Sequence, residues 1–308
     1  MDKTILALIF LMMFILTGVK AITTQPNFDS IFHYNHSIGN YENFDGKHPE
    51  ESYLERPKMV SWLSQIPLEI AKVITIKDVR FSLFGNFWFL LIFIGFPAFL
   101  YYVTKNYLVF PLFWILPTPY HFWFSGLYAQ FLSTIIFIVH IKFLNLKGNL
   151  KGKALVSWLI LIVGMNTHPS YLGLWILTLL IYIVWILNKV VIDKIILALI
   201  GIYSIIYLKI LFLFTLFNNF YILMLLWIKP NTFLFYYIVG LLVAGYFFNL
   251  RILDFGIIVL FIQFVQNYKE TTFKYLTTGQ NYFFLGAFVL IAVIQLLQAN
   301  TELIPKPI

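Results

Sequence analysis

The sequence predicts an all-α polytopic membrane protein, with about 11 transmembrane helices and a helical extracytoplasmic first loop. Three observations support this fold class. Of the 308 residues, 61% are hydrophobic and 11% are charged, whereas soluble domains carry about 25% charged residues. Apolar segments near the length of a spanning helix, about 17–25 residues, succeed one another after residue 80. No acidic residue occurs between Asp78 and Asp193.

The chain divides into three regions. Residues 1–21 are expected to form the first transmembrane helix, 22–80 an extracytoplasmic loop with juxtamembrane amphipathic helices, and 81–308 a multi-span transmembrane domain. The first apolar segment also fits a cleaved signal peptide, which would end at the small residue Ala21. We expect a retained signal anchor, because the charged region before it is minimal and Lys20 is poorly suited to a cleavage site.

One segment of the loop has the pattern of an amphipathic helix. In residues 59–73, MVSWLSQIPLEIAKV, apolar side chains recur at helical spacing, which predicts a helix lying on the membrane surface. Pro67 is expected to bend or break this helix, because proline lacks the backbone N–H that a helix interior uses.

The multi-span domain is expected to follow as a series of closely spaced helices. Their predicted bounds are 81–103, 107–118, 121–141, 154–167, 170–187, 190–208, 210–228, 232–248, 251–266 and 282–298. Several of these helices are short or abut one another, and prolines at 111, 117, 119 and 169 lie at or near the junctions.

Basic residues set the predicted orientation. With the N-terminus in the cytoplasm, the inner loops hold 11 basic residues and the outer junctions after the first loop hold 3, as the positive-inside rule requires. The loop at residues 142–153 is the clearest cytoplasmic marker. The first loop then lies outside the cell membrane and contains 8 of the 13 acidic residues. Such a concentration of carboxylates favours chemistry or ligand recognition on that side.

Composition also excludes several classes of function. The formal charge of +8 comes from basic residues scattered through short loops, so no nucleic-acid partner is expected. The chain has no cysteine, which excludes disulfides and thiolate chemistry. Aromatic residues make up 20% of the chain, and a single aromatic residue therefore carries little information.

Asp29 and His33 are the first candidates for chemistry. They lie in the segment PNFDSIFHYNHSIGNY at residues 26–41, shortly after the first helix. In a helix, residues four apart share a face, so the carboxylate and the imidazole could form an acid–base pair or contribute two metal ligands. The alternative is a solvated loop helix in which the histidine is packed or exposed.

Arg56 and Lys58 flank Pro57 just before the amphipathic segment. At this place they would lie at the depth of lipid headgroups, where a lipid phosphate is found. Arginine suits bidentate contact with phosphate. The alternative is ordinary snorkelling of both side chains toward anionic headgroups.

His168 lies in NTHPSY at residues 166–171, between two predicted spans and on the same outer side as Asp29. It is either a polar cap of a tight junction or a member of a functional site with the acidic loop. His121, in PTPYH at another outer junction, is a weaker candidate of the same kind.

The arrangement resembles the GT-C class of integral membrane glycosyltransferases, which take sugars from polyprenyl- or dolichyl-phosphate carriers. The first helix leads into an external loop with an early aspartate, in FDSIFHY, and the loop ends in juxtamembrane helices, in ERPKMVSWLSQIPLEIAKV. Many spans follow, with a His-Pro at an outer junction, in THPSY. The topology covers most of the chain, whereas the matched motifs amount to short, loose segments.

This resemblance implies roles for individual residues. Asp29 would be the general base, with His33 beside it, and Arg56, Lys58 and His168 would bind the donor phosphate. The implied partners are a polyprenyl- or dolichyl-phosphate sugar and membrane lipid. No cofactor is implied. A metal site is not supported, because Ser30 stands where many members carry a second acidic residue.

Two other functions compete with glycosyl transfer. A transporter or channel would fit the number of spans, but the spans carry almost no ionisable residues, which transport pathways usually need. A non-catalytic membrane subunit or assembly factor would also fit. The sugar, the acceptor and the oligomeric state are left open by the sequence.

Overall fold

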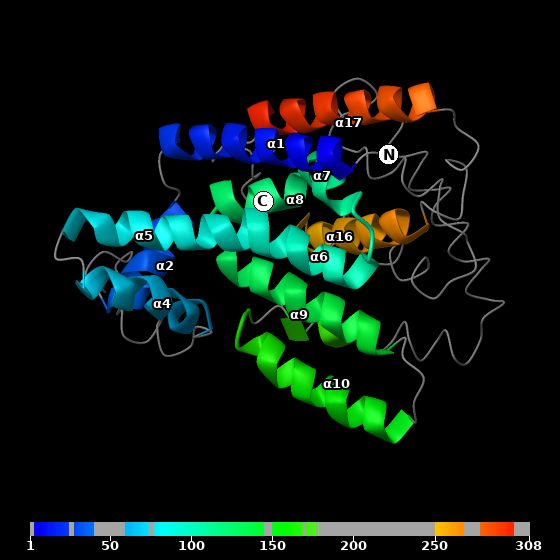
Figure 1. The fold of residues 1–308 in the computed structure, drawn as a ribbon. Coiled ribbons are helices and arrows are strands. Elements are labelled where there is room, and N and C mark those ends of the chain that lie inside the picture. Colours follow the sequence, from blue (N-terminus) through cyan, green and yellow to red (C-terminus); the bar gives the residue numbers. More distant parts are fainter. Residues whose placement is uncertain are drawn as a thin grey trace. The chain divides into compact units, whose positions relative to one another are not determined.

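The computed structural model describes most of the chain in separate stretches. These are residues 3–24, 28–39, 59–73, 77–144, 150–168, 171–172, 174–176, 178, 250–267 and 278–298. All regular structure in them is helical, which confirms the all-α class (Figure 1).

The described residues form a series of helices. Their bounds are α1 Lys3–Thr23, α2 Phe28–Ile38, α4 Met59–Val73, α5 Lys77–Leu90, the π-helical segment η1 Leu91–Gly95, α6 Phe96–Thr104, α7 Val109–Leu112, the 3-10 segment η2 Phe113–Ile115, α8 Pro117–Phe124, α9 Tyr128–Leu144, α10 Leu150–Met165, α16 Leu250–Asn267 and α17 Thr278–Gln298.

Within the described stretches, two helices are long and apolar enough to cross a membrane. They are Lys3–Thr23 and the continuous helix Arg80–Thr104, which comprises most of α5 together with η1 and α6. Shorter apolar helices occur in α9, α10, α16 and α17. These features are compatible with membrane association, and the multi-pass topology with about 11 spans stays a prediction.

Most predicted helices in the described residues are present, with shifted ends. Two of them differ more. The helix predicted at 121–141 is interrupted between the end of α8 and the start of α9. The single helix predicted at 107–118 is divided into α7, η2 and the start of α8. Pro111 and Pro117 lack the N–H that would continue one α-helix through this segment. α4, in contrast, continues through Pro67 without a break. The predicted helices at 190–208, 210–228 and 232–248 lie outside the described residues, as does most of 170–187.

The described helices belong to two compact units whose segments alternate along the chain. The first unit contains α1, α6, α7, η2, α16 and α17; the second contains α2, α4, α5, η1, α9 and α10, and α8 contributes to both. The predicted regions 1–21, 22–80 and 81–308 concern membrane topology rather than packing, and they stay a prediction.

In the first unit, α1 and α17 run parallel (Figure 1). The ammonium of Lys20, near the end of α1, donates to the backbone carbonyls of Leu296 and Leu297 near the end of α17. Lysine suits this place, because the last carbonyls of a helix have no partner inside the helix. At the other end of this unit, the Asn106 amide after α6 donates to the Val265 carbonyl of α16 at 2.8 Å.

In the second unit, α4 and α5 form an antiparallel helical hairpin. The two helices pack closely, and α2 packs against both. Trp88 of α5 donates its indole N–H to the Ser64 hydroxyl of α4 at 3.1 Å, and both side chains are buried. Burial of Val60 and Leu68 on the same face of α4 explains why the helix persists through its proline.

α9 and α10 form a second antiparallel hairpin in this unit. Three polar contacts join the two helices along their length. Ser133 bonds Thr167 at 2.6 Å, His140 bonds Ser157 at 2.7 Å, and Lys153 donates to the Leu144 carbonyl at 2.7 Å. Along these three contacts the residue numbers increase in α9 and decrease in α10, so the two helices are antiparallel.

Ser157→Ala is expected to lower the free energy of unfolding by about 1–3 kcal/mol. The substitution leaves the fully buried Nε2 of His140 without its partner. The Trp175 indole also loses its bond to the Ser157 hydroxyl at 3.0 Å but keeps its bond to the Ser157 carbonyl at 2.8 Å. Of the two side chains, only His140 therefore loses the partner of a bonded atom. Thermal unfolding in detergent measures the change. Ser82→Ala, at an exposed serine of α5, is the matched control and is expected to have no effect.

Candidate functional site

Asp29 and His33 both lie on α2, one turn apart. Asp29 occupies the first turn of this helix, where the positive end of the helix dipole favours a negative side chain. Both residues are partly exposed. The local prediction of a helix that carries both groups on one face is therefore confirmed in its geometry, while their chemical roles stay a prediction.

Gly126 holds the start of α2 in place. It lies in the turn between α8 and α9 with a φ of 65°, a left-handed conformation that glycine adopts without strain. A Cβ at this position would lie 2.5 Å from the Ser30 nitrogen and 2.9 Å from the carbonyl carbon of Asp29. The backbone of Asp29 and Ser30 thus contacts the Gly126 turn directly.

A buried polar and aromatic cluster fixes the same turn of α2 from the other side. The hydroxyl groups of Ser30 and Tyr128 form a hydrogen bond at 3.1 Å. The Tyr128 ring stacks on Trp88, with centroids 4.7 Å apart and an interplanar angle of 8°. Because Trp88 also bonds Ser64, the cluster connects α2 with α4, α5 and α9.

His33 contributes to this aromatic cluster. Its ring lies 5.7 Å from the Tyr128 ring, centroid to centroid, and 5.4 Å from the ring of Phe32. On the next face of α2, burial raises the pKa of the Tyr34 hydroxyl above its ordinary value, and the positive charge of Arg80 partly offsets that effect. Tyr34 therefore stays protonated and serves α2 as a packing residue.

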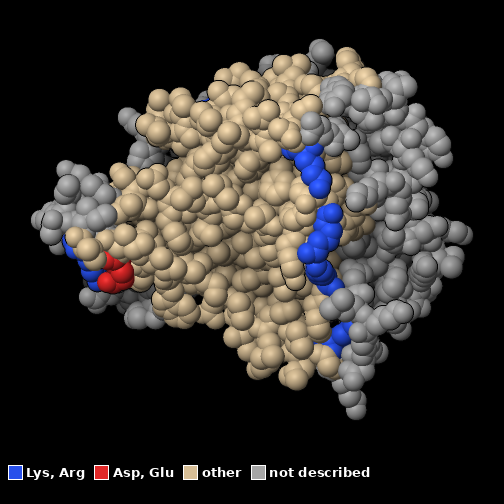
Figure 2. Space-filling model, viewed as in Figure 1, with Lys and Arg blue, Asp and Glu red and all other residues tan. Residues whose placement is uncertain are grey.

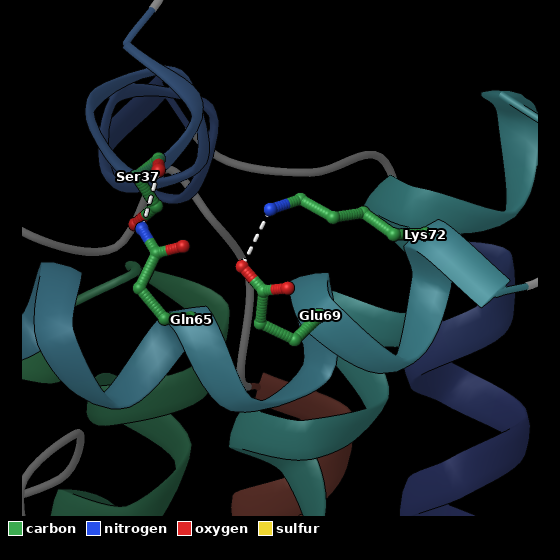
Figure 3. A network of polar contacts seen from close by, with 4 residues as sticks. All are labelled: Ser37, Gln65, Glu69 and Lys72. Carbon is green, nitrogen blue, oxygen red and sulfur yellow. Dashed lines mark hydrogen bonds and ion pairs between the residues drawn. The ribbon is translucent and has the colours of Figure 1, made fainter.

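α4 closes the other end of α2. The side-chain amide of Gln65 donates to the Ser37 carbonyl at 2.7 Å, in the last turn of α2 (Figure 3). One turn further along α4, Glu69 and Lys72 form an exposed ion pair at 2.5 Å (Figure 3). Figure 2 shows the acidic side chains of the visible face at its left edge, over α4, whereas most of the basic side chains lie on the right half of that face. α2 is thus held at both ends.

His168 lies in the turn that follows α10. The backbone N–H of His168 donates to the Gly164 carbonyl at 3.1 Å, and the His168 side chain is partly exposed. The buried bond between Thr167 and Ser133 attaches this turn to α9. The N–H of Met59, the first residue of α4, donates to the Asn166 carbonyl at 3.2 Å.

These contacts place the backbone of Asp29 and the turn that carries His168 at one end of the α9–α10 hairpin. We call it the Asp29 end, defined by the Asp29 backbone, Gly126, Met59 and the turn at 166–168. The opposite end, the lysine end, carries Lys142 and Lys153. The prediction that Asp29 and His168 lie on the outer side of the membrane, opposite the loop at 142–153, stays a prediction.

Arg56 and Lys58 lie outside the described residues, so their predicted contact with phosphate stays a prediction. Met59, which follows Lys58 in the chain, is the residue bonded to the His168 turn. Among the described residues, no group of three or more His, Cys, Asp or Glu side chains is arranged to hold a metal ion.

Comparisons of the chain with protein-family models, curated proteins and solved structures find no match. Any function is therefore argued from this geometry.

Sequence reasoning missed Gly126, Tyr128 and Trp88. The dipeptide Ser125-Gly126 interrupts the predicted helix at 121–141, and it was the available sign of a turn. Tyr128 and Trp88 carried no such sign, because aromatic residues are abundant throughout this chain. Their importance follows only from the contacts that bring residues 30, 64, 88 and 128 together.

Proposed function

We propose that this protein is an inverting glycosyltransferase of the GT-C kind. It moves a sugar from a polyprenyl-phosphate carrier to an acceptor on the outer face of the cell membrane. The observation that carries this proposal is the placement of Asp29. Its backbone is held by the Gly126 turn and the Ser30–Tyr128 bond, at the same end of the α9–α10 hairpin as His168.

The proposed topology has the N-terminus in the cytoplasm and the first loop outside. In the first unit, the Lys3 ammonium lies over the ring of Tyr107, 4.5 Å from its centroid, close in sequence to Lys105. These lysines share one end of the unit, as cytoplasmic lysines would. The parallel course of α1 and α17 supports an odd number of spans, as the 11 predicted helices require.

In the proposed reaction, the Asp29 carboxylate removes the proton from an acceptor hydroxyl group. The acceptor oxygen forms a bond to C1 of the sugar as the bond between C1 and the phosphate oxygen breaks. The lipid phosphate leaves with the electron pair, and the configuration at C1 inverts. A base fixed to a rigid helix end suits this step, because proton transfer needs hydrogen-bond reach of the substrate.

The leaving phosphate gains negative charge, so cations placed beside it lower the barrier. Arg56, Lys58 and His168 are proposed for this role, and His33 is proposed to assist Asp29. The bond between Met59 and Asn166 supports the grouping, since it joins the residue after Lys58 to the turn that carries His168.

The test is sugar transfer by the purified protein in lipid vesicles. A panel of radiolabelled polyprenyl-phosphate sugars serves as donor, with native membranes as the source of acceptor. Release of label from the lipid, dependent on acceptor and protein, supports the proposal. If no donor is consumed while solute flux across the vesicles depends on the protein, the transporter hypothesis replaces it. If the protein instead co-purifies with an enzyme through its first loop, it is a non-catalytic subunit.

His168→Ala is expected to lower the transfer rate by about 10–100-fold, as loss of one charge-assisted contact to phosphate would. The reduction should appear in kcat more than in KM, because the phosphate charge develops in the transition state. His36→Ala is the matched control, at a partly exposed histidine of the same unit with no proposed role in the reaction, and it should retain the wild-type rate. Equal rates for wild type and His168→Ala would remove His168 from the site.

A further inference from the structure

The α9–α10 hairpin is short for a pair of transmembrane helices. From Lys153, in its first turn, to Asn166, the residue after its end, α10 extends about 20 Å at 1.5 Å per residue. From Tyr128 to Leu144, α9 extends about 24 Å. The hydrocarbon core of a typical bilayer is about 30 Å thick. α1, with 21 residues, reaches about 30 Å and matches that thickness.

Polar groups mark both ends of this short apolar stretch. Lys142 is exposed at the lysine end, and Asn166 is exposed at the Asp29 end. Between them, α10 presents large exposed apolar side chains: Leu155, Trp158, Leu159, Ile162 and Val163. A continuous apolar face bounded by polar ends is what hydrocarbon chains would cover.

At the lysine end, Lys153 does not lengthen the hairpin by snorkelling. A free lysine side chain can extend its ammonium toward the headgroups. Lys153 instead turns toward α9 and donates to the Leu144 carbonyl at 2.7 Å. Its charge is therefore held at the level where α9 ends. Tilting the hairpin would shorten its projection on the membrane normal further.

We infer that the exposed face of α10 is covered by the acyl chains of a locally thinned bilayer. The apolar stretch is shorter than the average hydrocarbon core by about 6–10 Å. Bilayers adjust to such mismatch by thinning around the protein, at a modest cost for each Å. In the proposed orientation, thinning would draw the outer headgroups toward the Asp29 end. The inference depends on α10 spanning the membrane and does not depend on sugar transfer.

The first experiment measures the thermal unfolding midpoint in phosphatidylcholine vesicles whose acyl chains have fourteen to twenty-two carbons. We expect the highest midpoint with fourteen or sixteen carbons and a fall of several degrees toward the longest chains, because mismatch increases with thickness. The inference would be overturned if the midpoint were highest at eighteen carbons or more, or if it did not depend on acyl-chain length.

The second experiment asks directly whether lipid covers α10. The wild-type chain has no cysteine, so Leu159→Cys and Asn166→Cys each provide a single site for a spin label. At position 159 the label should collide with oxygen dissolved in lipid more than with a water-soluble nickel complex. At position 166 the order should be reversed, even with the longest acyl chains. Access of the nickel complex to position 159 would show that water or protein, rather than lipid, faces this surface.

Discussion

Asp29→Asn is expected to reduce sugar transfer by about 10²–10⁴-fold, the usual contribution of a general base. Asparagine has nearly the shape of aspartate but cannot accept the proton of the acceptor hydroxyl. The backbone contacts of residue 29 with Gly126 do not involve the carboxylate, so the fold should persist. Initial rates of label transfer from the polyprenyl-phosphate donor measure the loss.

Two controls separate catalysis from folding in this experiment. The melting temperature of Asp29→Asn in detergent should stay close to that of the wild type. Glu69→Gln removes another carboxylate of the same unit, whose partner is the exposed Lys72, and should leave transfer unchanged. Wild-type activity in Asp29→Asn would refute the assignment of the base, and a similar loss in Glu69→Gln would point to a general effect of charge.

The described helices within residues 22–80 could be predicted because their signals are local. α4 begins at Met59 and ends at Val73, at the limits set by the spacing of its apolar residues. Asp29 and His33 share α2 because residues four apart align in any helix. The expectation that His168 lies on the same side of the membrane as Asp29 came from counting spans and lysines, and it stays a prediction.

The parts that could not be predicted depend on contacts between distant residues. Nothing near Ser30 in the sequence indicates that it meets Tyr128, 98 positions away. The predicted helix at 121–141 is interrupted at Gly126 because the chain there turns to receive α2. The His140–Ser157 pair was missed for the same reason, since each residue alone resembles an isolated polar group within an apolar helix.

Gly126→Ala is expected to lower the free energy of unfolding by about 2–6 kcal/mol and to reduce transfer as strongly as Asp29→Asn. Two costs combine. A non-glycine residue in a left-handed conformation costs about 1–3 kcal/mol, and overpacking costs about 1–3 kcal/mol more. The new Cβ would lie 2.7 Å from the Ser30 Oγ and closer still to the Ser30 nitrogen. The Ser30 nitrogen belongs to the backbone and cannot rotate away as a side chain could. The start of α2 must therefore move, and Asp29 moves with it.

Gly85→Ala is the matched control, because its Cβ would lie 3.6 Å from Trp123, an ordinary contact in the same unit. Gly126→Asn separates the two costs, since asparagine tolerates the left-handed conformation but still carries a Cβ. If crowding against α2 dominates, the asparagine variant should be as inactive as the alanine variant. If Gly126→Ala has the same free energy of unfolding and the same transfer rate as Gly85→Ala, the turn does not position Asp29. The carboxylate would then be held by α2 alone, and the link between this fold and the chemistry would be lost.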